Sequence, residues 1–356
     1  MRLRRAKTDE RGFRLARARL IGLGWRRSFA GILSVAVRTT PGILVIAALA
    51  VLSACDANRI LAFANSGGGN GGSAGGNPSD AGGNPSDAMG NQTDAGHGTP
   101  FGPPRLVTGL RTDTDDVQDP SLTFEELELY FASPTGGRND IWVSRRTVAT
   151  DPWGPSTLVA ELSTPQNDQD PEVSVDGLVM YLASDRGGGG MRLYLSQRRT
   201  RDTPWGTPAL VAGLGASTLD EAPGLDRSQL NLAFASQRGT AASPHLFAAT
   251  RPDASAPWQA ATEMTALSSA WEDADPALFS NGSGLVFASR RLTQGGTADL
   301  FEATRPNESA PFASLAPVTE LNTAYTEEDP WLSQDGTHIV FVSDRSGHSR
   351  IYEARR

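Results

Sequence analysis

Cysteine and lysine are almost absent from this chain of 356 residues, which contains one cysteine, Cys55, and one lysine, Lys7. A single cysteine excludes an internal disulfide framework and a zinc site built on cysteine pairs. The four histidines are widely spaced, which argues against a histidine-built metal centre. Because a membrane-spanning helix needs about 20 apolar residues, the longest apolar run, at 42–54, is too short to be one.

The net charge of −8 hides a marked asymmetry along the chain. The first 54 residues hold 11 of the 32 basic residues and 2 of the 40 acidic ones. Subtraction leaves 21 basic and 38 acidic residues from Cys55 onward, a net charge of −17. An acidic body of this kind argues against nucleic acid as the main partner.

The N-terminal segment has the features of an export signal. The run at 42–54 follows Arg38 and has the length of a signal-peptide hydrophobic region. It ends in Leu52-Ser53-Ala54-Cys55, which resembles the lipobox of bacterial lipoproteins. The resemblance implies cleavage before Cys55, acylation of that residue and anchoring to a membrane of the cell envelope. The alternative is an uncleaved segment with an inert cysteine.

A low-complexity segment separates this signal from the rest of the chain. Residues 65–100 are mostly Gly, Asn, Ser, Asp and Ala, and GGNPSDA occurs at 75–81 and again at 82–88. Such a composition cannot bury enough apolar surface to offset its ordering entropy. We therefore predict a lipoprotein signal peptide at 1–54 and a lipid anchor with a disordered linker at 55–99.

The remainder, residues 100–356, consists of five copies of one unit. Five FAS-like segments end in serines that are 51, 52, 53 and 54 residues apart: Ser133, Ser184, Ser236, Ser289 and Ser343. An aromatic residue recurs in step, at Phe101, Trp153, Trp205, Trp258 and Phe312. A leucine does so too, at Leu110, Leu162, Leu214, Leu267 and Leu321. Three markers at one period indicate a repeat architecture.

Each unit contains four short alternating segments, and turn signals such as Asp176-Gly177 and Asp335-Gly336 lie between the first and second. About 50 residues with four strands are typical of a propeller blade. The fifth unit lacks a fourth strand, while an extra one, residues 104–110, precedes the first unit. The sequence thus predicts an all-β fold: a single five-bladed β-propeller at 100–356, closed by pairing of 104–110 with 350–356.

The units resemble the WD40-like repeat of TolB-type propellers. Unit two carries Asp170-Pro171, Asp176-Gly177 and Asp185-Arg186, and unit five has the same three pairs. Unit three departs, with Ala222 before its proline and Asp226-Arg227 where Asp-Gly is expected. The resemblance implies a cell-envelope propeller that binds other proteins or glycans, and it implies no particular ligand.

Acidic residues at the start of the first strands are the candidate site. Four precede a proline and four stand two residues before such a position: Asp119, Asp170, Asp275 and Asp329, and Asp168, Asp220, Asp273 and Glu327. First strands line the channel of a propeller, so these carboxylates can form a ring that holds a cation, such as a structural calcium, or a basic peptide. The alternative is structural, with each carboxylate accepting backbone N–H groups in an Asx-type turn.

Two other repeated features have structural interpretations that compete with binding ones. The arginine pairs that follow the third strands, such as Arg145-Arg146 and Arg198-Arg199, either meet neighbouring acids or bind phosphate or peptidoglycan. The tryptophans either pack between blades or form a sugar platform.

These features favour a non-catalytic, monomeric envelope lipoprotein whose propeller binds another protein or peptide, without a cofactor. A lectin-like glycan or peptidoglycan receptor is one alternative. A polysaccharide-active glycoside hydrolase, which needs two suitably spaced carboxylates, is the other. The repeated units at 100–356 contain neither the G-x-S-x-G nor the H-E-x-x-H motif of catalytic sites.

Overall fold

The computed structural model describes residues 99–111, 116–215, 217, 219–238 and 242–356, and the backbone of three strands nearer the N-terminus. The chain divides into two compact units, residues 1–89 and 90–356. In the first unit an antiparallel sheet contains β1 (Arg14–Leu15), β2 (Val35–Thr40) and β3 (Ile43–Ala48), in that order.

Strand β3 lies within the apolar run at 42–54. Cys55 and the linker as far as residue 98 lie outside the described residues, so the signal-peptide and linker boundaries stay predictions. In the part of the chain that the structure describes, no helix is long and apolar enough to cross a membrane.

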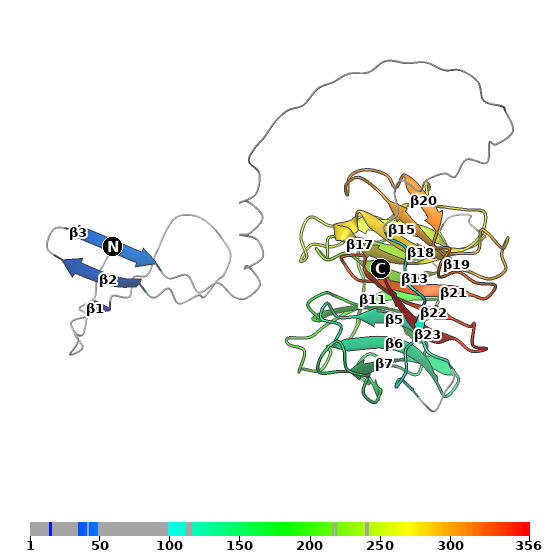
Figure 1. Ribbon diagram of the computed structural model, residues 1–356, viewed down its shortest axis with the longest axis horizontal. Helices are drawn as coiled ribbons and strands as arrows, with labels where there is room; N and C mark the ends of the chain where they lie inside the picture. Colours follow the sequence, from blue (N-terminus) through cyan, green and yellow to red (C-terminus); the bar gives the residue numbers. More distant parts are fainter. Residues whose placement is uncertain are drawn as a thin grey trace, which may run out of the picture. The chain divides into compact units, whose positions relative to one another are not determined.

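The second unit is built from five antiparallel sheets of four strands (Figure 1). Blade one contains β5 (Gln118–Leu122), β6 (Glu128–Thr135), β7 (Arg138–Arg145) and β8 (Thr157–Leu158). Blade two contains β9 (Asp168–Val173), β10 (Val179–Ser184), β11 (Arg192–Gln197) and β12 (Ala209–Leu210). Blade three contains β13 (Asp220–Leu225), β14 (Asn231–Ser236), β15 (His245–Thr250) and β16 (Thr262–Glu263).

Blade four contains β17 (Asp273–Phe279), a 3₁₀ turn η3 (Ser280–Gly282), β18 (Gly284–Ser289), β19 (Asp299–Thr304) and β20 (Ser314–Pro317). Blade five contains β21 (Glu327–Leu332), β22 (His338–Ser343), β23 (Arg350–Arg355) and, from the other end of the propeller, β4 (Arg105–Leu106).

The ring closes as the sequence predicts. Strand β23 pairs antiparallel with β4, and Tyr352 faces Leu106 in the register. The first strands of neighbouring blades contact one another in cyclic order, from β5 through β9, β13 and β17 to β21 and back to β5. The predicted all-β, five-bladed propeller with N-terminal strand closure is therefore confirmed.

The outer strands are much shorter than the seven-residue segments expected from the sequence. Four of the five pair over only two residues. Immediately afterwards the chain turns inward, which buries the recurring leucine, such as Leu162 or Leu321, between blades. Burial of this leucine outweighs further ladder bonds at an exposed edge, because each buried leucine contributes about 1.5–3 kcal/mol.

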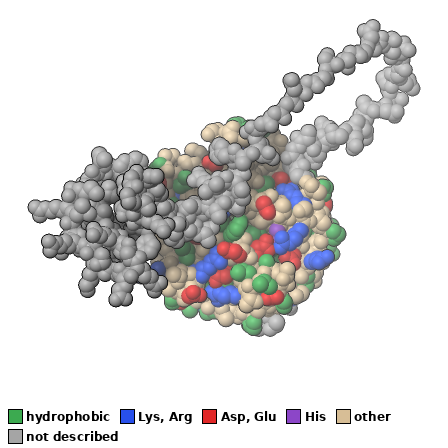
Figure 2. All heavy atoms as spheres, turned by 60° about the vertical axis from the view of Figure 1, so that its left-hand side comes forward, with side chains coloured by type: hydrophobic (Ala, Val, Ile, Leu, Met, Phe, Trp, Pro, Cys, Tyr) green, Lys and Arg blue, Asp and Glu red, His purple; other side chains and the backbone are tan. Residues whose placement is uncertain are grey.

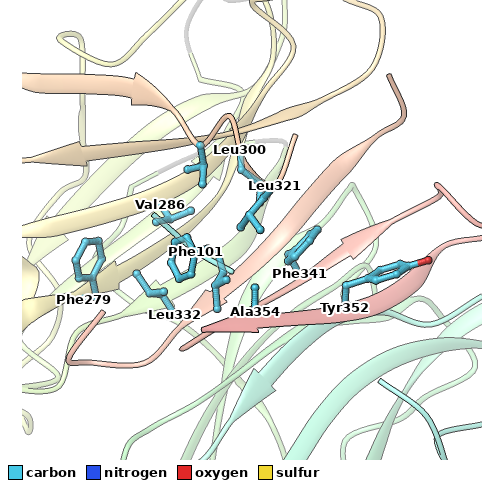
Figure 3. Close-up of a cluster of buried hydrophobic side chains, with 11 residues drawn as sticks. Phe101, Phe279, Val286, Leu300, Leu321, Leu332, Phe341, Tyr352 and Ala354 are labelled. Atoms are coloured by element: carbon cyan, nitrogen blue, oxygen red, sulfur yellow. The ribbon is translucent and has the colours of Figure 1, made fainter. Parts of the chain in front are cut away.

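The hydrophobic core consists of five clusters, each of which lies between two neighbouring blades. Figure 3 shows the cluster between blades four and five, where Leu300 of β19 and Phe341 of β22 share the space with Phe101. Phe101 comes from the N-terminal end of the propeller, so this cluster also joins the two ends of the ring.

The turns between first and second strands require a positive φ, and two blades meet this need without glycine. Gly177 and Gly336 both have φ of 72°, and at the equivalent positions Glu126 has φ of 55° and Gln229 has φ of 59°. The alignment of Asp226-Arg227 with Asp-Gly was wrong, because the structure places Ser228-Gln229 there.

Candidate binding site on the propeller axis

The first strand of every blade contains a bulge at the same position. The residue there has a positive φ of 49° to 54°, and the pairing with the second strand shifts register beside it. A proline always follows. Aspartate tolerates a positive φ better than most residues, which suits it to this bend. We call the five bulged residues the axial residues: Asp119, Asp170, Ala222, Asp275 and Asp329.

The axial residues are linked from blade to blade. The backbone N–H of Asp170 donates to Oδ2 of Asp119 at 3.1 Å, and the N–H of Ala222 donates to Oδ2 of Asp170 at 2.9 Å. On the other side of the ring, Asp329 donates to Asp275 at 3.3 Å and Asp119 to Asp329 at 3.1 Å. Each donor belongs to the next blade, so these bonds differ from the Asx-type turns considered from the sequence.

Alanine at position 222 has no carboxylate, and the ring of bonds is open between blades three and four. The axial residues and the prolines that follow them line a cavity of about 60 Å³. Because four carboxylates share so small a cavity, their ionisation is strongly perturbed.

Burial raises the pKa of Asp275 to about 8, with further contributions from the charges of Glu328 and Asp170. Burial likewise raises the pKa of Asp119 and Asp329 well above the usual range, and each is raised further by the charge of the other axial acids. The pKa of Asp170 is also raised by burial. Repulsion between carboxylates in a desolvated site is the physical cause.

The four acids that stand two residues before an axial residue do not line this cavity: Asp168, Asp220, Asp273 and Glu327. In blade two, Asp168 accepts hydrogen bonds from Ser184 Oγ and from an Arg186 guanidinium nitrogen, both at 2.5 Å. The same arginine nitrogen donates to the carbonyl of Leu162 at 2.6 Å. Asp220, Asp273 and Glu327 form the same triad with a serine and an arginine. These four carboxylates are neutralised inside the fold, so the binding hypothesis now concerns the axial set alone.

Glu221 is a half-buried acid that the sequence analysis missed. It stands immediately before axial Ala222 on β13. Burial, together with the smaller effect of the charges of Asp170 and Asp275, raises its pKa to about 8. Its carboxylate has no hydrogen bond and no basic partner among the described residues. Its position differs between blades (Gln118, Gln169, Glu221, Ala274 and Glu328), and this departure from the repeat was the signal available in the sequence.

The surroundings of Glu221 define one end of the axis, which we call the start-side mouth because the first strands begin there. Burial raises the pKa of Glu328, although Arg290 lies 3.7 Å from it. The segments that lead into β17 and β21 carry exposed Trp271 and Tyr325, which are 38% and 51% accessible. Two of the first strands are therefore preceded by an exposed aromatic ring on the side where Glu221 and Glu328 lie.

A metal site is less well supported. In the described part of the chain, no group of three or more His, Cys, Asp and Glu side chains could hold a metal ion. Each axial carboxylate also has one oxygen engaged by a backbone N–H. The residues as placed do not form a calcium cage, and structural calcium stays a prediction.

The repeated arginines and aromatic residues form one structural unit. Arg198 lies over the ring of Trp205, 4.4 Å from its centre, and its Nε donates to the carbonyl of Gly177 in the hairpin. The arrangement recurs in the other blades with Arg146, Arg251, Arg305 and Arg356. The rings are buried in the clusters between blades, so the sugar-platform alternative for the tryptophans is wrong. On the face in Figure 2, acidic and basic side chains are interspersed.

Comparison with known proteins finds chains of similar fold. No family model and no curated protein matches the chain. The catalytic domain of a GH62 α-L-arabinofuranosidase from Coprinopsis cinerea is similar to it, with 12% identity, a TM-score of 0.51, and coverage of 70% of this chain and 95% of the other. TolB from Acinetobacter baumannii has 15% identity and a TM-score of 0.45, and the match covers 68% of this chain and 55% of the TolB chain. At these identities the likeness shows the propeller fold alone.

Proposed function

We propose that this propeller is a non-catalytic binding protein that takes a cationic group of a protein or peptide at its start-side mouth. The observation that carries this proposal is Glu221, a half-buried carboxylate with acids around it and no basic partner among the described residues. A lysine or arginine side chain there would offset the repulsion between the carboxylates and so allow them to ionise. Trp271 and Tyr325 offer ring faces on which the same cation can be stabilised.

The proposal predicts a proton signature on binding. At pH 7, groups with a pKa of about 8, such as Asp275 and Glu221, are mostly protonated. A bound cation lowers their pKa, so protons are released and the affinity rises by up to about tenfold per pH unit for each proton between pH 6 and 8. Isothermal titration of the protein with N-acetyl-Gly-Arg-Gly-amide, in buffers of different ionisation enthalpy, measures this proton release.

Matched variants locate the site. Glu221→Gln and Asp275→Asn should each weaken binding about tenfold or more and remove proton release, whereas exposed Glu308→Gln should leave both unchanged. Binding without proton release, or binding insensitive to both substitutions, contradicts the proposal. Proton release with CaCl₂ together with a raised melting temperature, both lost in Asp170→Ala/Asp329→Ala, would instead establish a calcium site.

The hydrolase alternative shares the same carboxylates and is tested separately. Turnover of labelled arabinoxylan that is abolished by Asp170→Asn would establish catalysis, and we expect none. The aromatic residues Trp271 and Tyr325 are also compatible with a glycan ligand, which a glycan array would reveal as binding lost in Trp271→Ala.

We also propose that Cys55 anchors the propeller to the bacterial cell envelope through a lipid. The Leu52-Ser53-Ala54-Cys55 sequence supports this proposal. Cells that express the full chain should incorporate labelled palmitate into the mature protein, and Cys55→Ser should abolish labelling and release the protein from the membrane fraction. Equal labelling of the Cys55→Ser protein would overturn the lipid anchor.

A further inference from the structure

At the opposite end of the axis, at the hairpins between first and second strands, the five blades carry different residues. Five residues after each axial residue stand Phe124, Val175, Arg227, Ser280 and Gln334. By contrast, the recurring leucines, the recurring serines and the arginines that lie over the aromatic rings are the same residue type in every blade. Because packing alone favours similar side chains in equivalent places, this variation marks a surface that is free of the constraint of the repeat.

All of these residues except Ser280 line a pocket of about 370 Å³, which we call the hairpin-side pocket. Its volume lies at the lower end of the roughly 300–1,000 Å³ range of small-ligand sites. Apolar walls come from Leu122, Val173, Val175 and Leu225. Phe124, Trp331, Arg227 and Arg355 supply rings and positive charge.

The acids of this pocket are already satisfied. Glu126 accepts a hydrogen bond from Arg355 at 2.7 Å and contacts His338 Nδ1 at 2.9 Å. Glu172 accepts from Ser121 Oγ at 2.9 Å and from the Leu225 N–H at 3.2 Å. Asp335 accepts from the hydroxyl of Ser333 at 2.6 Å. None of the three carboxylates therefore needs a ligand to complete its bonding.

Arg227 differs from the acids of this pocket, because its charge has no partner of opposite sign among the described residues. Its guanidinium lies 5.0 Å from the ring centre of Phe124. The stack holds the cation at the pocket while leaving its N–H donors available, and a guanidinium matches a carboxylate geometrically.

Gln334 adds an unsatisfied acceptor. Its Nε2 donates to the carbonyl of Leu278 at 3.2 Å, but its buried Oε1 has no hydrogen-bond partner within the described residues. The side chain lines both the axial cavity and the hairpin-side pocket. Because an unpaired buried carbonyl oxygen is costly, a ligand with an N–H donor would be stabilised there.

We infer that the hairpin-side pocket binds the carboxyl terminus of a peptide with an apolar last residue. The carboxylate meets Arg227, a backbone N–H reaches Gln334 Oε1, and the apolar side chain lies against Leu122, Val173 and Leu225. The apolar wall favours an aliphatic side chain over a sugar. One face of the Phe124 ring is covered by Arg227, which disfavours stacking of a sugar there. This inference is independent of the cationic partner proposed for the other mouth.

The test compares a free acid with its amide. Titration of ¹⁵N-labelled protein with N-acetyl-Ala-Leu should shift the indole signal of Trp331, which Trp331→Phe assigns. N-acetyl-Ala-leucinamide should bind about tenfold more weakly, because it lacks the charge that pairs with Arg227. Arg227→Gln should abolish the difference between the two peptides, and exposed Arg199→Gln should preserve it.

Equal binding of acid and amide, an unchanged preference in Arg227→Gln, or no shift at millimolar peptide overturns the inference. Tighter binding of glucuronic acid than of N-acetyl-Ala-Leu would replace the peptide with an acidic sugar and also overturn it. Binding of the arginine peptide at the start-side mouth should survive Arg227→Gln, so the two proposals fail separately.

Discussion

Replacing His338 by alanine should lower the free energy of unfolding of the propeller by about 3 kcal/mol. His338 is 1% exposed at the start of β22, with Nδ1 2.9 Å from Glu126 and Nε2 3.1 Å from Glu353. Glu126 belongs to blade one and the other two residues to blade five, so the network joins the blades at which the ring closes. Urea unfolding measures the loss, and the exposed pair of His245 with Glu263 provides the matched control, His245→Ala.

The contribution of this network depends on pH in a defined direction. The two carboxylates raise the pKa of His338 above 6.5 against the opposing effect of burial, the largest single influence. Its stabilisation is thus complete below pH 6.5 and is lost as the pH rises through the raised pKa. Burial opposes ionisation of Glu126, but the hydrogen bonds and charges of His338 and Arg355 together outweigh it and lower the pKa of Glu126 to about 2. That part is present above pH 4.5 and is lost as the pH falls toward 2.

The difference in stability between the wild type and His338→Ala should therefore be largest between about pH 4.5 and 6.5 and should shrink on either side. A difference that is constant from pH 4 to pH 9 would show that the imidazole acts by packing alone, and would contradict the ion-pair account.

Arg186→Ala should cost about 3–5 kcal/mol, because it leaves a buried charge without its cation. Asp168 is fully buried and has Arg186 2.5 Å away. The substitution also leaves the carbonyl of Leu162 without that donor. Thermal and urea unfolding give the size of the effect, and Arg199→Ala, on an exposed residue of the same blade, should change stability by less than about 0.5 kcal/mol.

Blade one suggests a compensating change. Val117 occupies the position that corresponds to Asp168, and Thr135 the position of Arg186, so the fold accommodates two uncharged side chains there. Asp168→Val combined with Arg186→Ala should therefore be more stable than Arg186→Ala alone. Additive losses would contradict the view that the cost arises from the uncompensated carboxylate.

Most of the architecture could be predicted from the sequence, because the repeat is a local pattern copied five times. The spacing of Ser133 and its four equivalents gave the blade number, and the surplus segment at 104–110 gave the closure. The short outer strands were missed, since the turn that buries Leu162 depends on the neighbouring blade. The shifted turn of blade three was missed because Gln229 adopts a conformation that the sequence associates with glycine.

The candidate site was predicted less completely. The sequence grouped eight acids, and the structure separates them into four axial residues and four that lie in arginine–serine triads. Nothing in the motif distinguishes Asp168 from Asp170, although only the second lines the axial cavity. Glu221 was overlooked because it is not part of the repeated motif, and its importance arises from Asp170 and Asp275 on other blades.

The scarcity of cysteine excluded a disulfide framework, and the five-fold repeat with its unmatched first and last segments was sufficient to determine the class of fold, since periodicity and strand patterning are local properties of a chain. Tertiary structure alone decided which carboxylates are neutralised, which pKa values rise and where unpaired groups such as Arg227 and Gln334 meet. The triads join residues 16 to 18 positions apart, such as Asp168 and Arg186, and the axial bonds join residues 51 or more apart, such as Asp119 and Asp170. Both depend on burial that exists only in the closed ring.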